Sequence, residues 1–163
     1  MLDLVPFCKW LEQSWVGGGV RESSWLFPVI ETVHLLGMAA LVGTVGVFDL
    51  RLLGWVMRGE RVSELGARLL PWAWAGFVMQ VITGVILFSS EAVKVYGNPA
   101  FRMKMLLILL AGVHALIFHW GVERDVAAWD VSAVLPAKAK AAGAISILLW
   151  IGIVAAGRFI GFV

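Results

Sequence analysis

The sequence predicts an all-α fold, an integral membrane four-helix bundle with an N-terminal interfacial amphipathic helix. Hydrophobic residues make up 61% of the chain and charged residues only 15%, against about 25% charged in an ordinary soluble domain. The apolar residues also fall in four long blocks, and a helix of about 20 mainly apolar residues crosses a bilayer. The expected spans are 25–48, 71–88, 101–120 and 141–162. Because they leave no room for a separate soluble domain, residues 21–163 are expected to form one membrane domain.

Residues 1–20 are expected to form an amphipathic helix followed by a glycine linker. Between residues 2 and 16, apolar side chains recur at helical spacing on one face, and charged and polar residues occupy the others. This pattern favours a helix that lies in the membrane interface, although a helix that packs over the bundle fits it equally well. The glycines at 17–19 favour an end to that helix. The single cysteine, Cys8, excludes an internal disulfide.

Turn signals separate the spans. Pro28 falls in the first turn of the first span, where its missing N–H costs little. The stretch Tyr96-Gly97-Asn98-Pro99 is typical of a turn. It predicts that the second and third spans form a tight antiparallel hairpin.

The arginines between the first and second spans predict the orientation. This short connection contains Arg51, Arg58, Arg61 and Arg68, and loops rich in Lys and Arg face the cytoplasm. Both termini are then expected on the periplasmic or outer side. The net charge of +2 is too small to indicate a nucleic-acid partner.

Ionisable side chains inside the spans are the first candidates for function. Insertion of an Asp, Lys or Arg costs roughly 2.5–3.5 kcal/mol, so ionisable residues inside a span usually have a role. The second span adds the uncharged polar residues Gln80 and Thr83. The ionisable candidates are Glu31 and His34 on the first span, His114 and His119 on the third, and Arg158 on the fourth.

His34 is the strongest candidate for a cofactor ligand. Glu31 lies three residues before it, on the same helix face, and a carboxylate there could orient a ligating imidazole. The first and third spans start from the same side, so a rise of about 1.5 Å per residue puts His114 roughly 6 Å deeper than His34. His119 is deeper still, at roughly 13 Å, and the nearer His114 is therefore the better second ligand. A proton or substrate contact, or a purely structural hydrogen bond, remains an alternative for His34.

Two facing imidazoles predict haem b, because imidazole is a common axial ligand of haem iron. Haem propionates need cations, and Arg102, Lys104 and Arg158 are all expected at the outer end near His34. Each of these three is also a plausible interfacial anchor. Zinc is disfavoured, because it needs three or four clustered ligands.

Three stretches also resemble a known family. Residues 31–37, 48–54 and 99–107 are similar to uncharacterised bacterial four-helix membrane proteins that share a domain of unknown function. More distantly, the pattern resembles the HemJ-type protoporphyrinogen oxidases and the CopD-type copper-resistance membrane proteins. The early histidine, the arginine at the far end of its helix and the later lysine of those families match His34, Arg51 and Lys104, and His114 approximates a later histidine. The resemblance implies haem b bound through the histidine, with the lysine also involved.

The resulting expectation is a haem b-binding protein of the bacterial inner membrane that passes electrons to or from quinone or a partner subunit. A HemJ-like enzyme that oxidises a porphyrin is one alternative, so enzymatic activity is left open. A cofactor-free small transporter or accessory subunit is another. The bilayer is the first expected partner, and the glycine-lined helices are compatible with a homo-oligomer or a larger membrane complex.

Overall fold

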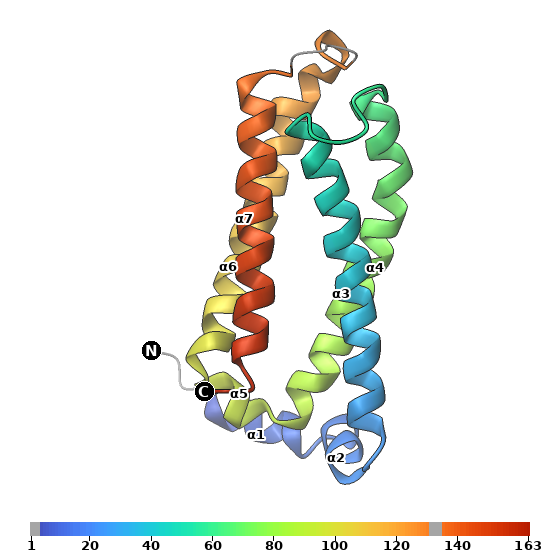
Figure 1. Cartoon of the computed structure of the whole chain (residues 1–163). Helices are drawn as coiled ribbons and strands as arrows, with labels where there is room; N and C mark the ends of the chain where they lie inside the picture. The colour runs from blue at the N-terminus through green and yellow to red at the C-terminus, as the bar shows by residue number, and fades with distance from the viewer. Residues whose placement is uncertain (1–3, 131–134) are drawn as a thin grey trace.

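Four long helices run alternately up and down along one axis in the computed structural model, which describes residues 4–130 and 135–163 (Figure 1). They are α3 (Leu26–Leu52), α4 (Val62–Ser90), α6 (Pro99–Ile117) and α7 (Ala137–Phe159). A π-helical turn, η1 (Phe118–Val122), and a 3-10 segment, η2 (Glu123–Ala128), continue α6. All four helices are long and apolar enough to cross a membrane. The four predicted spans and the all-helical class are therefore confirmed, and the described residues contain no strand.

The helices associate as two pairs. α3 packs along α4, α6 packs along α7, and α3 also contacts α7. The short helix α5 (Ala92–Gly97) separates α4 from α6, and Asn98 then caps α6 by accepting hydrogen bonds from the amides of Ala100 and Phe101. α4 and α6 meet near this connection, where Phe88 stacks on Phe101, and not along their length. The prediction of a tight hairpin between these two spans is therefore wrong, because each helix finds its packing partner elsewhere.

Glycines allow the close helix contacts. A Cβ atom on Gly76 of α4 would lie 2.7 Å from the backbone nitrogen of Leu41 and 2.9 Å from the carbonyl oxygen of Gly37, both on α3. On α7, a Cβ atom on Gly143 would lie 2.8 Å from the carbonyl oxygen of Asp49. Small residues let helix backbones approach in a membrane, where apolar burial does not drive helices together. These two contacts set how α3 faces α4 and α7.

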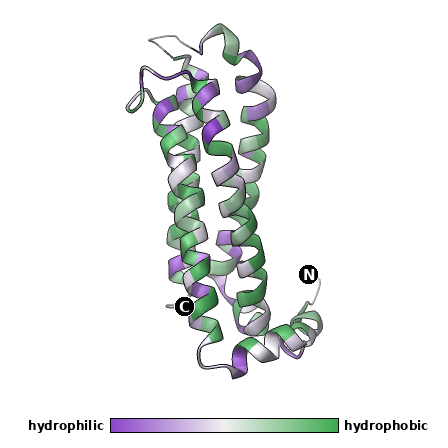
Figure 2. Ribbon diagram, turned by 90° about the vertical axis from the view of Figure 1, so that its right-hand side faces the viewer, coloured by the Kyte–Doolittle hydropathy of each residue, from purple (hydrophilic) through white to green (hydrophobic). Residues whose placement is uncertain are grey.

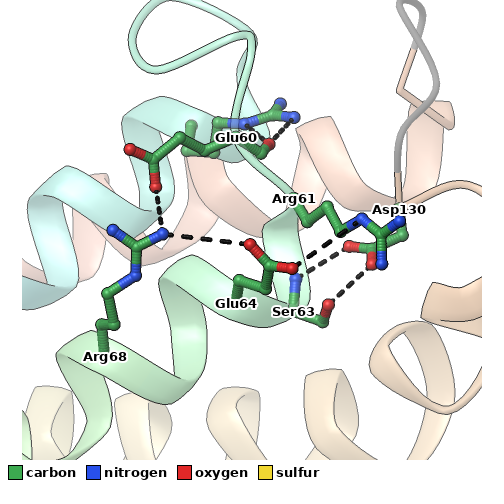
Figure 3. A network of polar contacts seen from close by, with 7 residues as sticks. Glu60, Arg61, Ser63, Glu64, Arg68 and Asp130 are labelled. Atoms are coloured by element: carbon green, nitrogen blue, oxygen red, sulfur yellow. Dashed lines mark hydrogen bonds and ion pairs between the residues drawn. The ribbon is translucent and has the colours of Figure 1, made fainter.

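α4 begins before the predicted boundary at Pro71. The helix starts at Val62, and Pro71 lies inside it. The added turns carry charged residues that pair with one another, as Figure 3 shows: Arg68 lies 2.8 Å from Glu60 and 3.9 Å from Glu64. Figure 2 places such hydrophilic residues towards the ends of the long helices, with hydrophobic residues along their middles. A proline removes one hydrogen bond from a helix, and α4 packs against α3 on both sides of it, at Gly66 and at Gly76.

Two short helices, α1 (Val5–Glu12) and α2 (Trp15–Glu22), lie across the end of the bundle where α3 begins (Figure 1). The predicted glycine linker is wrong, because Gly17, Gly18 and Gly19 are inside α2. A Cβ atom on Gly17 would lie 2.6 Å from the carbonyl oxygen of Ser89, so glycine here permits contact with the end of α4.

α1 is also held in place, as an amphipathic segment that packs against the bundle. Glu12 accepts a hydrogen bond from the amide of Val93, with a distance of 2.9 Å. Cys8 is buried, and burial, with a contribution from Glu12, raises the pKa of its thiol. These contacts fasten α1 to the connection between α4 and α6.

Candidate functional site

His34 lies on the face of α3 that packs against α4. It is one turn from Gly37, at the close crossing of the two helices. Its imidazole Nδ1 is 2.7 Å from the hydroxyl oxygen of Thr83, and Gln80 donates a hydrogen bond to its backbone carbonyl. The ring edge formed by Nδ1 and Cε1 also faces Gly84, where a Cβ atom would lie 3.4 Å from Cε1. Both the ring and the backbone of His34 are thus held by one turn of α4.

The hydrogen bonds of Thr83 favour one tautomer of His34. The Thr83 hydroxyl donates to the carbonyl oxygen of Met79 at 2.6 Å, so it is an acceptor towards the imidazole. This arrangement favours the tautomer of the neutral ring that has its proton on Nδ1 and its lone pair on Nε2. In the part of the chain that the structure describes, Nε2 makes no hydrogen bond. This atom is available to a ligand that enters the bundle.

Lys104 is the basic residue associated with His34. It lies on α6, partly buried, and its positive charge acts on the His34 imidazole. On the other side, its ammonium lies 3.5 Å from the position of a Cβ atom on Gly157 of α7. Among the described residues, Lys104 has no carboxylate within ion-pair distance. The bundle thus holds a cation without an acidic partner within electrostatic range of the His34 imidazole.

Glu31 does not contact His34 through a hydrogen bond. Its side chain is exposed on α3, and Nδ1 of His34 is bonded to Thr83 instead. The three-residue spacing brings the two side chains to neighbouring positions on α3, but the inward rotation of His34 towards α4 selects a partner from that helix. The orienting group is therefore a hydroxyl from the second span.

His114 is at a different level of the bundle. Its Nε2 lies 3.0 Å from the carbonyl oxygen of Ala142, to which it donates, and Ala142 precedes Gly143, which packs against Asp49. Asp49 is about 15 residues beyond His34 on α3, or roughly 22 Å at 1.5 Å per residue. The structure therefore does not bring His114 to His34, because His114 packs at the level of Asp49, near the end of α3.

The remaining predicted residues are exposed near the ends of their helices. His119 lies 2.6 Å from Glu123, one turn further on. The guanidinium of Arg102 lies 5.3 Å from the centre of the Tyr96 ring, and that of Arg158 lies 5.7 Å from the centre of the Phe162 ring. Cations on aromatic rings at helix ends are typical of interfacial anchors.

Asp49 is a buried acidic residue that the sequence did not single out. Its side chain is 4% exposed, Ser146 on α7 provides a hydrogen bond, and its Oδ2 atom has no partner among the described residues. The predicted first span ends at Phe48, which leaves Asp49 in the connection that follows it. The signal that could have found it is the recurrence of leucine after this carboxylate, at Leu50, Leu52 and Leu53.

The chain was compared with protein families, curated proteins and solved structures. The searches of curated proteins and of solved structures found no match. One family model matches residues 7–163, which is nearly the whole chain, and it describes a family of unknown function, DUF6644. The protein whose α3 and α4 bring His34 against Thr83 therefore belongs to the DUF6644 family of unknown function.

Proposed function

We propose that this protein binds haem b through His34 and transfers electrons in the bacterial inner membrane, to or from quinone or a partner subunit. The observation that carries the proposal is the hydrogen bond between Nδ1 of His34 and Thr83. Ligating histidines usually donate their second ring N–H to a fixed acceptor, which sets the tautomer and the orientation of the ring. Thr83 supplies that acceptor, and Nε2 is left with its lone pair.

The donor set fits haem better than a bare metal ion. In the described chain, no three His, Cys, Asp or Glu side chains gather at one place, and a structural or catalytic zinc site needs at least three protein ligands. Haem needs only one or two axial ligands from the protein. A single well-oriented histidine is therefore sufficient.

Lys104 fits the charge of the same group. A lysine inside a membrane-spanning helix is costly unless it has a partner, and the described residues offer it no carboxylate. A haem propionate is an anion that this ammonium could bind. Bound haem would supply one-electron redox chemistry, and the chain's own part is to orient His34, balance charge at Lys104 and exclude water.

The second candidate function is that of a HemJ-like enzyme that oxidises a porphyrin. The observation that favours it is the position of His114, whose Nε2 is bonded to Ala142 at the other end of the bundle. Without a second histidine nearby, haem would be held by His34 alone or by His34 together with Lys104. An open or weakly held position permits substrate or oxygen chemistry, whereas two histidines favour electron transfer alone.

An optical spectrum of the purified protein tests the proposal. The protein, expressed with haem freely available, is measured oxidised and then reduced by dithionite, and a pyridine haemochrome assay gives the haem content. We expect a reduced b-type spectrum with close to one haem per chain, and His34→Ala should lose it. His119→Ala is the matched control, because it removes an exposed imidazole from the same bundle and should retain the haem.

Two results would contradict haem binding. One is a colourless wild-type protein, which would favour a cofactor-free transporter or accessory subunit. The other is a His34→Ala variant with unchanged haem content and spectrum. Restoration of haem synthesis in cells that lack their own protoporphyrinogen oxidase would instead identify the porphyrin-oxidising enzyme.

A further inference from the structure

A basic cavity lies at the end of the bundle opposite to His34. Its volume is about 460 Å³, and it lies between the connection that follows α3 and the beginning of α7. Its lining includes three cations, Arg51, Arg58 and Lys140, and three apolar residues, Leu53, Trp55 and Leu135. We call this cavity the basic end pocket. It is separate from the proposed haem site, and the inference below does not depend on haem binding.

Arg51 gives the basic end pocket a buried charge. The residue is 2% exposed, and its Nε and Nη2 atoms donate to the backbone carbonyl oxygen of Glu60 at 3.2 and 2.7 Å. That acceptor is neutral, so these hydrogen bonds fix the guanidinium without cancelling its charge. A buried cation in this state is stabilised by an anion that enters the cavity.

The other two cations are also without an acidic partner. Arg58 donates to the carbonyl oxygen of Gly54, and Lys140 has an exposed side chain at the start of α7. In residues 4–130 and 135–163, none of the three cations lies within ion-pair distance of a carboxylate.

The acidic residues near this end lie outside the pocket, the buried Asp49 among them. Glu60 and Glu64 pair with Arg68, and Asp130 accepts hydrogen bonds from Ser63, as Figure 3 shows. No acidic side chain lines the basic end pocket. Its charge is therefore purely positive.

We propose that the basic end pocket binds a phosphate group, from an anionic phospholipid headgroup or from free phosphate. Arginine guanidinium groups match phosphate oxygens in geometry and charge. Basic pockets at the ends of transmembrane helices are a known means of binding anionic lipid headgroups. Leu53, Trp55 and Leu135 give this cavity an apolar wall, and Trp55 is 69% exposed, as suits contact with lipid at the interface.

The test compares two charge-matched double variants of the full chain. Arg58→Gln with Lys140→Gln removes two cations from the pocket and leaves the buried Arg51 in place. Arg61→Gln with Lys138→Gln removes two exposed cations from the same end but outside the pocket. Each protein is titrated with phosphatidylglycerol, with phosphatidylcholine and with inorganic phosphate. Thermal unfolding and native mass spectrometry report stabilisation and bound lipid.

We expect the ligand to stabilise the wild type in a saturable way, and the control variant should retain this stabilisation. The pocket variant should lose it, with the apparent affinity reduced about tenfold or more. If phosphatidylglycerol produces it and inorganic phosphate does not, the phosphate belongs to a lipid. If inorganic phosphate alone produces it, the ligand is free phosphate. Equal responses of the two variants, or no stabilisation of the wild type by either probe beyond that of phosphatidylcholine, would overturn the proposal.

Discussion

The Nδ1 atom of His34 lies 2.7 Å from the Oγ1 atom of Thr83, and this contact joins the first membrane span to the second. Thr83 is buried and donates its own proton to the carbonyl oxygen of Met79. The pair therefore favours protonation of the imidazole at Nδ1. In a membrane interior, where water does not compete for hydrogen bonds, such a contact favours one tautomer and one direction of the ring.

Replacing Thr83 by valine should weaken haem binding without preventing insertion into the membrane. The substitution preserves shape but removes the acceptor, and loss of such a supporting partner usually costs ten- to a hundredfold in affinity. Haem titration of the purified variant measures the effect. A separate Thr83→Ser variant keeps the hydroxyl and should bind haem as the wild type does. Thr44→Val is the matched control, because the Thr44 hydroxyl bonds carbonyl groups of its own helix. Wild-type haem affinity in Thr83→Val would show that Thr83 does not support a ligand.

Replacing His114 by leucine should leave the haem spectrum unchanged and reduce stability. The variant loses the hydrogen bond to Ala142, and a bond of this kind contributes about 0.5–1.5 kcal/mol. Thermal unfolding and the reduced optical spectrum are measured on the same sample. A shift of the reduced bands or loss of haem in this variant would instead make His114 an axial ligand, as the sequence alone suggested.

Replacing Gly76 by alanine should force α3 and α4 apart. The added Cβ atom would lie 2.7 Å from the backbone nitrogen of Leu41, and backbone cannot move aside as a side chain does. Overpacking of this kind typically costs about 1–3 kcal/mol. Thermal unfolding in detergent checks it, with Gly43→Ala on α3 as the control, because nothing lies within 4 Å of a Cβ atom there. The control should be neutral or slightly stabilising, as alanine favours helix over glycine. Equal stability of the two variants would contradict the close crossing.

Asp130 should stabilise the start of α4 in a pH-dependent way. Burial by itself would raise the pKa of its carboxyl group, but the hydrogen bonds from Ser63 and the charge of Arg61 outweigh it and hold that pKa below the usual value. A lowered folded-state pKa means that the stabilisation is fully present above the unfolded-state pKa, about 3.9. It is lost as the pH falls through the lower folded-state pKa.

Asp130→Ala should therefore cost about 1 kcal/mol at pH 7, as for loss of a helix cap. Thermal unfolding of wild type and variant from pH 7 down to pH 2.5 measures the difference, which should shrink below about pH 4. Ser63→Ala should reproduce the loss, because it removes the hydroxyl that donates to the same carboxylate. A difference that stays constant with pH would contradict the assignment.

The fold could be predicted further than the site. The lengths of the apolar blocks were enough to identify four spans. A helix that crosses hydrocarbon must be mainly apolar along its whole length and must satisfy its own backbone hydrogen bonds. Helix ends were less predictable: α4 continues through Pro71 into charged turns, and the glycines at 17–19 are inside a helix. In both cases packing against another helix decided the outcome, and local propensity reports only what an isolated segment prefers.

The sequence by itself determined that this chain is a four-helix membrane protein and that His34, Lys104, Gln80 and Thr83 are unusual residues inside its spans. It could not determine which of them meet. Helical spacing made Glu31 the neighbour of His34, and depth along the helices made His114 its partner. The tertiary structure instead placed Thr83 at His34 and His114 at Ala142. The reason is that helix rotation and pairing depend on the close contacts at Gly76 and Gly143, which involve residues far apart in the chain.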